Sequence, residues 1–301
     1  MFTSHILPII SAATSGAVIL SRTLHTFGAG ESTIAEKLGD LMNRTRNPSV
    51  GTTVANGLVS LRINARFPSK EKAEQELEQT ANACRTALGD PIFGQDDDTL
   101  PQVVAALLTS NKQPATSHSS TISTAESCTG GLLAKLLTDI PGSSSYFTQG
   151  WITYSNQAKY ERLGVSMEVI NLNGAVSEPV VEAMARNARR LSKSTYALSI
   201  SGIAGPTGGS PSKPVGTVCI ALAHPPLPPA IGSEAQARRG EGRPAVSGVE
   251  PGEGRRGDDP SNSQVQARTF HFPGDREAIR DRAAKMALTM LRYHLLGKPM
   301  P

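Results

Sequence analysis

The sequence predicts an α/β protein in which a layered α/β domain follows a small α+β domain. From residue 121 onward, runs rich in β-branched residues alternate with amphipathic segments of about 10–15 residues, as strands and helices do in layered α/β domains. Before residue 99, two helical patterns flank a pair of β-branched runs separated by Asn56-Gly57, a strong hairpin signal. The chain has 301 residues, enough for about two domains.

Residues 22–98 are expected to form the small α+β domain. Its first helix is predicted over residues 31–43, where apolar side chains recur at helical spacing. The hairpin follows, and then a second helix over residues 69–88 with Ser69 as its N-cap. A short strand in the stretch GDPIFGQ completes the order helix, hairpin, helix, strand.

Residues 1–21 are largely apolar and lack acidic side chains, and three interpretations are open. No Lys or Arg precedes the apolar run, which disfavours a secretory signal. Pro8 and Gly16 interrupt the run before it is long enough to span a membrane. We expect the remnant of a lost upstream domain; a transit peptide and a first strand are the alternatives.

Residues 99–120 are expected to be a linker with one short helix, Leu100–Leu108, and residues 121–301 to be the layered domain. Strands are predicted in this domain for TISTAES, YFTQGWITYS, TYALSIS, KPVGTVCIALAH and QVQARTFHF. Helices are predicted for GGLLAKLLTDI, for SEPVVEAMARNARRLSKS, and for residues 275–296 with Asp275 as N-cap and Gly297 as stop.

A low-complexity insertion, residues 225–264, interrupts the layered domain. Pro, Gly, Arg and acidic residues dominate it, and without aromatic residues it cannot form a core. The strands on either side fit as antiparallel neighbours, so the insertion is expected to be an enlarged hairpin loop. Such a loop costs little, because closure entropy grows only logarithmically with length. Its arginines are interleaved with acids, which favours a solvated loop over a nucleic-acid contact.

The composition limits the partners and the compartment. The 30 basic residues are nearly balanced by 26 acidic ones, and a net charge of +4 is no signature of polyanion binding. The three cysteines are far apart and odd in number, which predicts free thiols and a reducing, cytoplasmic location. The six histidines show no metal-ligand spacing. We therefore expect no metal, no cofactor, no nucleic acid and no membrane partner.

The stretch TISTAESCTGG holds the first candidate for chemistry. A strand is predicted to end near Glu126 and a helix to begin near Gly130, and the glycine pair indicates a sharp bend between them. Ser127 would then lie above a helix N-terminus, whose unpaired N–H groups can stabilise an oxyanion or bind a phosphate. The alternative is that Ser127 and Thr129 only cap the helix. The thiol of Cys128 is expected to be buried packing.

A serine nucleophile needs a base, and no familiar serine motif supplies one here. The chain has neither G-x-S-x-G nor S-x-x-K at Ser127, and the loop GIAGPTGG is no P-loop. The candidate bases are Lys159, Lys135, Lys213 and His118. Lys159 follows a predicted strand end, where active sites of α/β proteins collect. It serves only if burial or a neighbouring cation lowers its pKa; spacing alone favours an ordinary exposed helix lysine.

Five ordered blocks between residues 118 and 301 resemble the C-terminal domain of the CinA family. They are AESCTGGLLAKLLTDIPGSSSYF, GWITYSNQAK, GAVSEPVVEAMA, SISGIAGPTGGSPSKPVGTV and FPGDREAIR. Residues 22–98 look like the KH-like middle domain of that family, and residues 1–21 like a remnant of its N-terminal domain. Enzymes of the family are nicotinamide-nucleotide amidohydrolases (PncC), also described as competence/damage-inducible proteins.

The resemblance implies hydrolysis of the carboxamide of nicotinamide mononucleotide (NMN) to nicotinate mononucleotide and ammonia. It places the serine nucleophile at Ser127, the lysine base at Lys159 and an associated tyrosine at Tyr154. The residues implied or expected to bind the substrate are Thr129, Gly130, Gly131, Ser201, Gly205, Gly208, Gly209 and Arg276. For the three glycines of the loop, a plain tight turn is the alternative to a ligand contact.

Two functions are open. One is an amidohydrolase with a Ser-Lys mechanism, in which N–H groups within residues 128–131 stabilise the oxyanion. The other is a pyridine-nucleotide-binding module without turnover. Gln157, where relatives often have an acid, and Ser201, where threonine is more common, depart from the family pattern. The KH-like region has no clear GxxG loop, which argues against RNA binding. A homodimer is expected.

Overall fold

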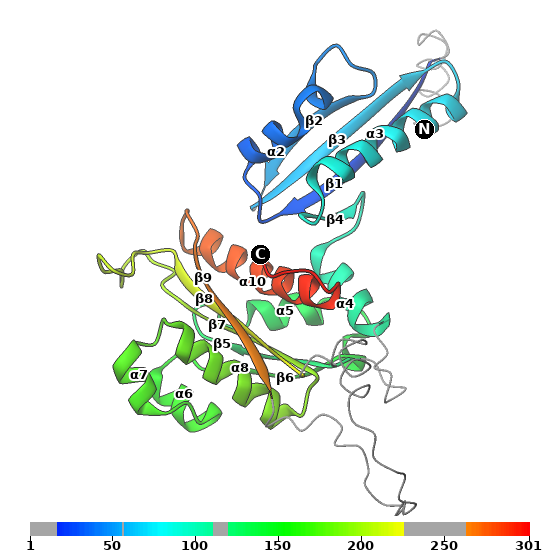
Figure 1. The fold of residues 1–301 in the computed structure, drawn as a ribbon. Coiled ribbons are helices and arrows are strands. Elements are labelled where there is room, and N and C mark those ends of the chain that lie inside the picture. The colour runs from blue at the N-terminus through cyan, green and yellow to red at the C-terminus, as the bar shows by residue number, and fades with distance from the viewer. Residues whose placement is uncertain (1–16, 56, 111–119, 226–262) are drawn as a thin grey trace, which may run out of the picture.

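The computed structural model describes residues 17–55, 57–110, 120–225 and 263–301. In this part of the chain two β-sheets lie one beyond the other, and helices pack on each of them (Figure 1). The four-stranded sheet comes first in the sequence, and the five-stranded sheet comes second. The predicted fold class, a layered α/β domain after a small α+β domain, is confirmed.

The first sheet is antiparallel, with strand order β2-β3-β1-β4. Its strands are β1 (Val18–Phe27), β2 (Ser49–Ala55), β3 (Leu58–Phe67) and β4 (Ile92–Gln95). Helices α2 (Glu31–Leu38), extended by a 3₁₀ turn at Gly39–Met42, and α3 (Lys70–Leu88) pack on it. Their residues Ile34 and Leu77 share one core with Leu24, Leu61 and Ile63 of the sheet.

The local signals of this domain are confirmed. The predicted hairpin is the pair β2–β3, although Asn56 at its tip lies outside the described residues. Ser69 caps α3, because its side chain accepts the N–H of Lys72 (3.2 Å).

Strand β1 corrects two expectations about the N-terminal region. It starts at Val18, inside the expected remnant, so the boundary between residues 21 and 22 cuts a strand. It pairs with β3 from Val18↔Phe67 to Phe27↔Leu58 and lies between β3 and β4. Pairing with a strand so distant in sequence leaves no local spacing signal, and the predicted order therefore lacked this strand. Residues 1–16 lie outside the described part of the chain.

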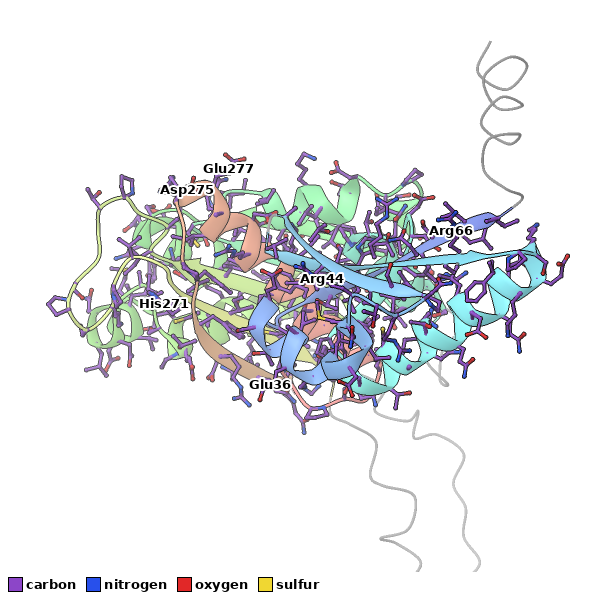
Figure 2. The ribbon with its side chains drawn as sticks, turned by 90° about the horizontal axis from the view of Figure 1, so that it is seen from above. Glu36, Arg44, Arg66, His271, Asp275 and Glu277 are labelled. Carbon is purple, nitrogen blue, oxygen red and sulfur yellow. The ribbon has the colours of Figure 1, made fainter. Side chains whose placement is uncertain are left out.

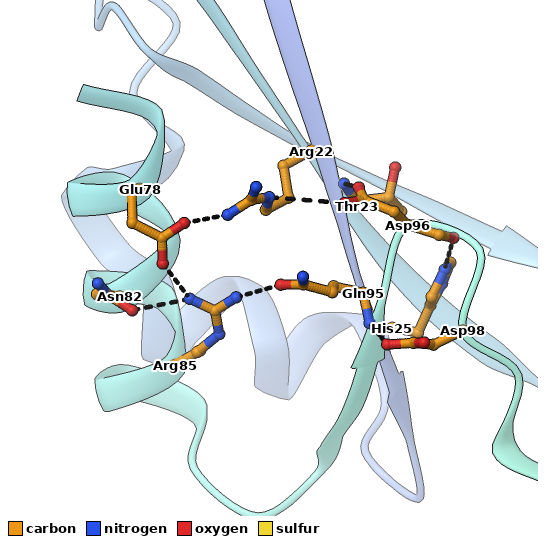
Figure 3. Close-up of polar contacts among 9 residues, drawn as sticks. All are labelled: Arg22, Thr23, His25, Glu78, Asn82, Arg85, Gln95, Asp96 and Asp98. Atoms are coloured by element: carbon orange, nitrogen blue, oxygen red, sulfur yellow. Dashed lines mark hydrogen bonds and ion pairs between the residues drawn. The ribbon is translucent and has the colours of Figure 1, made fainter. Parts of the chain in front are cut away.

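A network of polar side chains connects α3, β1 and β4 (Figure 3). Glu78 on α3 accepts from Arg22 on β1 and from Arg85 on its own helix. Arg85 also donates to the side chain of Gln95, the last residue of β4 (2.6 Å). Exposed ion pairs of this kind contribute little to stability, so the network orients the short strand β4 more than it holds the fold.

The second sheet is mixed, with strand order β6-β5-β7-β8-β9. Its strands are β5 (Ile122–Glu126), β6 (Phe147–Ile152), β7 (Tyr196–Gly202), β8 (Thr217–His224) and β9 (Gln264–His271). Strands β6, β5 and β7 are parallel, whereas β8 is antiparallel to β7 and β9. The predicted pairing of the last two strands is confirmed, with His224 opposite Gln264. Apart from its ends, the insertion between them lies outside the described residues.

Helices cover both faces of the second sheet (Figure 1). On one face lie α4 (Leu100–Ser110), α5 (Leu132–Thr138) and α10 (Arg276–Leu295), and on the other α6 (Asn156–Leu163), α7 (Met167–Asn173) and α8 (Glu178–Ser192). Successive side chains of β7 point to opposite faces of the sheet. Leu198 and Ile200 therefore pack in the core with α10, and Ala197 packs in the core with α8. Helix α7 was not predicted. The domain has three layers, as the alternation of strands and helices predicts.

Helix α4 corrects the expected linker, residues 99–120. The helix itself is confirmed, but Leu100, Val104 and Leu108 are buried in the core that α10 also lines. An apolar stripe on a helix needs a partner surface, and α10 supplies it from the far end of the chain. The first half of the expected linker therefore belongs to the layered domain, and residues 111–119 lie outside the described part.

The C-terminal part of α10 also contacts the first domain. Arg292 donates to the carbonyl oxygens of Asp90 (2.9 Å) and Ile92 (2.7 Å), which lie at the start of β4. Phe27 and Phe93 from the first sheet belong to the same core as the inner face of α10. Within the described ranges, no helix is long and apolar enough to cross a membrane.

Candidate active site

A tight turn after β5 holds Ser127. It follows Glu126, the last residue of the strand. The N–H of Ser127 donates to the carbonyl of Ile200 on β7 (2.9 Å), and the carbonyl of Ser127 accepts the N–H of Gly130 (3.1 Å). Gly130 and Gly131 have φ angles of +60° and +95°, a region that other residues rarely adopt. The sharp bend predicted from the glycine pair is confirmed.

Lys159 reaches this turn from α6. Because β5 and β6 are parallel neighbours, the residues that follow them lie at the same edge of the sheet. Ser155 caps α6 by accepting the N–H of Ala158 (3.0 Å), which places Lys159 in the first turns. Lys159 is 1% exposed, and its Nζ lies 3.2 Å from Ser127 Oγ and 2.9 Å from the carbonyl oxygen of Thr153. The alternative of an exposed helix lysine is excluded.

The surroundings of Lys159 favour the uncharged amine. Burial lowers the pKa of Lys159 below its ordinary value of 10.5, and a Cys128 thiolate would oppose this shift. Burial, however, raises the pKa of Cys128 to about 12, so the thiol is neutral and burial of the lysine prevails. As an uncharged amine, Lys159 accepts the hydroxyl proton of Ser127; as an ammonium, it donates to the same oxygen.

The carboxylate of Glu126 occupies the N-terminus of α5. Glu126 is 1% exposed, and its oxygens accept the N–H groups of Gly131 (3.0 Å), Leu133 (3.1 Å) and Ala134 (2.8 Å). Glu126, not Ser127, therefore caps the helix. The N–H of Gly131 was expected to be available to an oxyanion, but it is already bound to Glu126. A capping side chain normally comes directly before its helix, whereas Glu126 folds back across the turn, so the sequence did not reveal it.

Two other N–H groups of the turn are unpaired among the described residues, those of Cys128 and Thr129. The carbonyl oxygens of the same two residues accept from one side chain, Arg280 on α10, at 3.0 Å and 2.7 Å. Nothing in the local sequence points to Arg280, which is 151 positions from Thr129. Thr129 is fully buried whereas Cys128 is 6% exposed, so the N–H of Cys128 is the expected oxyanion donor that remains.

Arg276 meets Tyr154 at the beginning of α10. Asp275 caps this helix, as predicted, and Figure 2 shows Asp275 and Glu277 at its start. Arg276 donates to the hydroxyl of Tyr154 (2.9 Å) and to the carbonyl oxygen of Gly205 (2.8 Å). Tyr154 is 60% exposed. The hydroxyl of Tyr154 thus bonds to the guanidinium of Arg276 and not to Lys159, whose amine bonds to Ser127 and Thr153.

A cavity of about 210 Å³ opens beside these groups. It is lined by Ser127, Cys128, Tyr154, Asn156, Lys159, Ala175, Val176, Ser201, Gly202, Ala204 and Arg276. Five of the residues expected from the sequence are thus brought together: Ser127, Tyr154, Lys159, Ser201 and Arg276. The other six do not line the cavity: Thr129, Gly130, Gly131, Gly205, Gly208 and Gly209.

The glycine loop after β7 is shaped by its own packing. A Cβ on Gly205 would lie 2.6 Å from Cγ1 of Val215, and a Cβ on Gly209 would lie 2.8 Å from the backbone nitrogen of Val215. Gly208 has a φ of +90°. These constraints account for the glycines as a tight turn, and their contact with a ligand stays a prediction.

Ser201 and Gln157, which depart from the pattern of the resembled family, have different surroundings. The hydroxyl of Ser201 donates to the carbonyl of Ala175 (2.8 Å), a residue of the cavity wall that was not predicted. Gln157 donates to Glu161 on the exposed side of α6 (2.7 Å) and does not line the cavity. Ser201 therefore shapes the site, whereas Gln157 does not contact it.

The other candidate bases do not reach Ser127. Lys135 pairs with Asp139 on the surface (2.5 Å). The Nζ of Lys213 donates to two carbonyl oxygens, those of Asn173 (2.9 Å) and Val176 (2.8 Å), and so holds the wall next to α7. The fourth candidate, residue 118, lies outside the described residues.

Fold and site together define a class: a mixed α/β protein in which a buried lysine contacts a serine hydroxyl beside a small cavity. Across the described ranges there is no group of three or more His, Cys, Asp or Glu side chains placed to hold a metal ion. The three cysteines are buried and free.

Comparison with known proteins gives the family. The model of the CinA C-terminal domain matches residues 104–241, and that of the damage-inducible protein CinA KH domain matches residues 21–94. The chain belongs to the CinA family. The first match begins within α4, in agreement with the packing of this helix on α10.

Individual relatives agree with this assignment. A competence-damage inducible protein of Symbiobacterium thermophilum is 40% identical over 299 residues, which are 99% of this chain and 62% of the relative. A CinA-like protein of Prochlorococcus marinus is 44% identical over 217 residues, 72% of this chain and 49% of the relative. The crystal structure of competence damage-inducible protein A from Klebsiella pneumoniae matches with 27% identity and a TM-score of 0.50, over 65% of this chain and 95% of that chain. The chain thus spans only part of the Symbiobacterium and Prochlorococcus relatives, 62% and 49% of their lengths.

Proposed function

We propose that the chain hydrolyses the carboxamide of NMN to nicotinate mononucleotide and ammonia, with Ser127 as nucleophile and Lys159 as base. One observation carries the proposal: the Nζ of Lys159 lies 3.2 Å from Ser127 Oγ in a buried site that lowers the pKa of the lysine. A serine hydroxyl is a weak nucleophile unless a base takes its proton. An amine that is uncharged near neutral pH is such a base.

The reaction follows in two halves. Uncharged Lys159 takes the proton of Ser127 while Oγ attacks the amide carbon, and the carbonyl oxygen becomes an oxyanion. The N–H of Cys128 stabilises this charge, an effect of about 3–4 kcal/mol for one such donor. The carbon–nitrogen bond then breaks, and the nitrogen takes the proton from Lys159 and leaves as ammonia. Water, activated by the same lysine, cleaves the ester and regenerates Ser127.

The substrate is proposed to lie between Lys159 and Arg276. The cavity of about 210 Å³ is smaller than ligand sites usually are, about 300–1,000 Å³. It suits the nicotinamide ring, so the ribose and the phosphate extend toward its open side. Arg276, like Lys159, lines the cavity, and guanidinium groups suit phosphate oxygens. Tyr154 shares a hydrogen bond with it and borders the same space.

Family membership supports the proposal at a coarser level. The relatives are named for competence and damage induction, and the resemblance of the blocks around Ser127 and Lys159 adds the amidohydrolase reaction. Because the chain covers 62% of the Symbiobacterium relative, activities of a longer protein are not assigned to it. We propose a homodimer that acts in the cytoplasm on a small molecule, without nucleic acid or membrane. Sedimentation tests the dimer, and a salt-dependent gel shift tests the absence of nucleic-acid binding.

The test is ammonia release from NMN by the purified chain, together with Ser127→Ala and Lys159→Ala. Wild type should release ammonia. Lys159→Ala should lose about 10²–10⁴ in kcat, the usual contribution of a general base, and Ser127→Ala should lose at least as much because it removes the nucleophile. Calorimetry with NMN separates the competing function. Binding without ammonia release would support the pyridine-nucleotide-binding module, and full activity of Lys159→Ala would refute the assignment of the base.

A further inference from the structure

Arg280 donates two hydrogen bonds to the turn that holds Ser127, from the side away from the cavity. Its Nε donates to the carbonyl of Cys128 (3.0 Å) and its Nη2 to the carbonyl of Thr129 (2.7 Å). Arg280 lines a second, larger cavity of about 800 Å³ beside the start of α10, and it does not line the cavity of Ser127. The guanidinium therefore contacts the outer side of the turn.

Peptide geometry converts this contact into a direction for an N–H group. In a trans peptide the C=O and the N–H point in opposite directions, and the described cis bonds are at 47–48 and 205–206. Because Arg280 holds the carbonyl of Cys128, the plane of the Cys128–Thr129 peptide is fixed. The preceding peptide is fixed in the same way, since the carbonyl of Ser127 accepts the N–H of Gly130. Its N–H belongs to Cys128.

The remaining amides of this region are already used. Glu126 accepts the N–H groups of Gly131, Leu133 and Ala134. In hydrolases with a serine on a strand-to-helix turn, the residue after the nucleophile supplies one oxyanion N–H, and here that residue is Cys128.

We propose that Arg280 is a positioning residue: by holding the carbonyl of Cys128 it fixes this residue in the turn, so that the N–H of Cys128, which lines the cavity, forms the oxyanion hole of Ser127. The inference rests on the proposed function only for the nucleophilic role of Ser127. Loss of an oxyanion donor costs about 10²–10³ in kcat. Misdirecting a donor by removing Arg280 should cost about 10–10² in kcat, and KM should stay within about threefold.

The test compares Arg280→Met and Arg280→Lys with Arg282→Met. Arg282 is a matched control, because it lies on the same helix and donates to a carbonyl outside the turn, that of Pro273. Two rates are measured: NMN hydrolysis, and labelling of Ser127 by a fluorophosphonate followed by intact mass. Labelling also builds negative charge on an oxygen at Ser127, so it needs the same N–H group of Cys128 without needing NMN.

Arg280→Met should slow both rates by about 10–10² without shifting the pH midpoint, because Lys159 is untouched. Arg280→Lys should fall in between, and Arg282→Met should match wild type. Added guanidinium should partly restore Arg280→Ala, which a merely structural role would not predict. If thermal melting shows that Arg280→Met does not fold, the rates of Arg280→Lys and the rescue by guanidinium decide the role of Arg280.

Equal labelling rates in wild type and Arg280→Met would overturn the inference, as would a loss confined to KM, a shifted pH midpoint or absent rescue. A wild type that is labelled at Ser127 but releases no ammonia would refute NMN hydrolysis alone, and the labelling rates would still decide the role of Arg280. A wild type that is not labelled at all would overturn both.

Discussion

The amine of Lys159 and the hydroxyl of Ser127, 32 positions apart in the chain, lie 3.2 Å from each other. Lys159 is 1% exposed and Ser127 is 8% exposed, so water does not separate the two groups. The sequence left two routes to a low lysine pKa, burial and a neighbouring cation. The structure uses burial, and the contact is therefore one in which the lysine can act as an acceptor.

The activity should rise with pH because the uncharged form of Lys159 is the reactive one. Burial lowers the pKa of Lys159, so kcat/KM for NMN is expected to increase to a plateau with a midpoint below 10.5. Lys159→Arg stays charged and should lose about 10²–10⁴ in rate. Ammonia release measured over about pH 6–10 checks this. A rate that falls throughout that range would exclude an uncharged lysine as base.

Lys159→Met is expected to lose about 10²–10⁴ in kcat and to stabilise the fold near neutral pH. Because burial lowers the pKa of Lys159 in the folded chain, the unfolded chain binds the proton more tightly. Stability is therefore lost as pH falls from 10.5 through the lowered folded pKa, and the full penalty applies below it. The gain from Lys159→Met in urea unfolding should thus be larger at about pH 7 than at about pH 10.

The exposed Lys135 provides the matched control for this stability prediction. Lys135→Met removes a surface pair with Asp139, so its effect on the free energy of unfolding should be small and similar at both pH values. If Lys159→Met raises the free energy of unfolding equally at the two pH values, burial of the lysine charge does not destabilise the folded chain.

Glu126→Gln is expected to destabilise the chain by about 1–3 kcal/mol. The carboxylate accepts three N–H groups, whereas the amide would present an NH₂ group to at least one of them and would remove a negative charge from the N-terminus of α5. Urea unfolding measures the change. Glu161→Gln, at an exposed site on α6, is the control, and equal stabilities of the two variants would contradict the capping role.

Arg276→Gln should weaken the reaction of NMN more than that of nicotinamide riboside. A hydrogen bond to a charged group contributes about 1.5–3 kcal/mol, so kcat/KM for NMN should fall by about 10–10² while the riboside is little affected. Tyr154→Phe removes the Arg276–Tyr154 bond without removing the cation, and it separates the two effects. If both substrates lose equally, the guanidinium does not bind the phosphate.

Elements with local signals could be predicted from the sequence. The caps Ser69 and Asp275, the hairpin β2–β3 and the pairing of β8 with β9 all lie where the residues indicate. Strand β1 and the packing of α4 could not be predicted in this way, because each is stabilised by a partner far away in the chain. Local spacing reports only on neighbours within about one helical turn or one hairpin.

The sequence by itself determined which residue types come together: a hydroxyl at a glycine bend after one strand and a lysine after the next. Only the tertiary structure decided that Glu126 caps α5, that Arg280 holds the Cys128 carbonyl, and that burial lowers the pKa of Lys159. The reason is physical. Desolvation and hydrogen bonds between distant segments depend on how α6 and α10 pack against the edge of the sheet, and no short stretch of the chain encodes that packing.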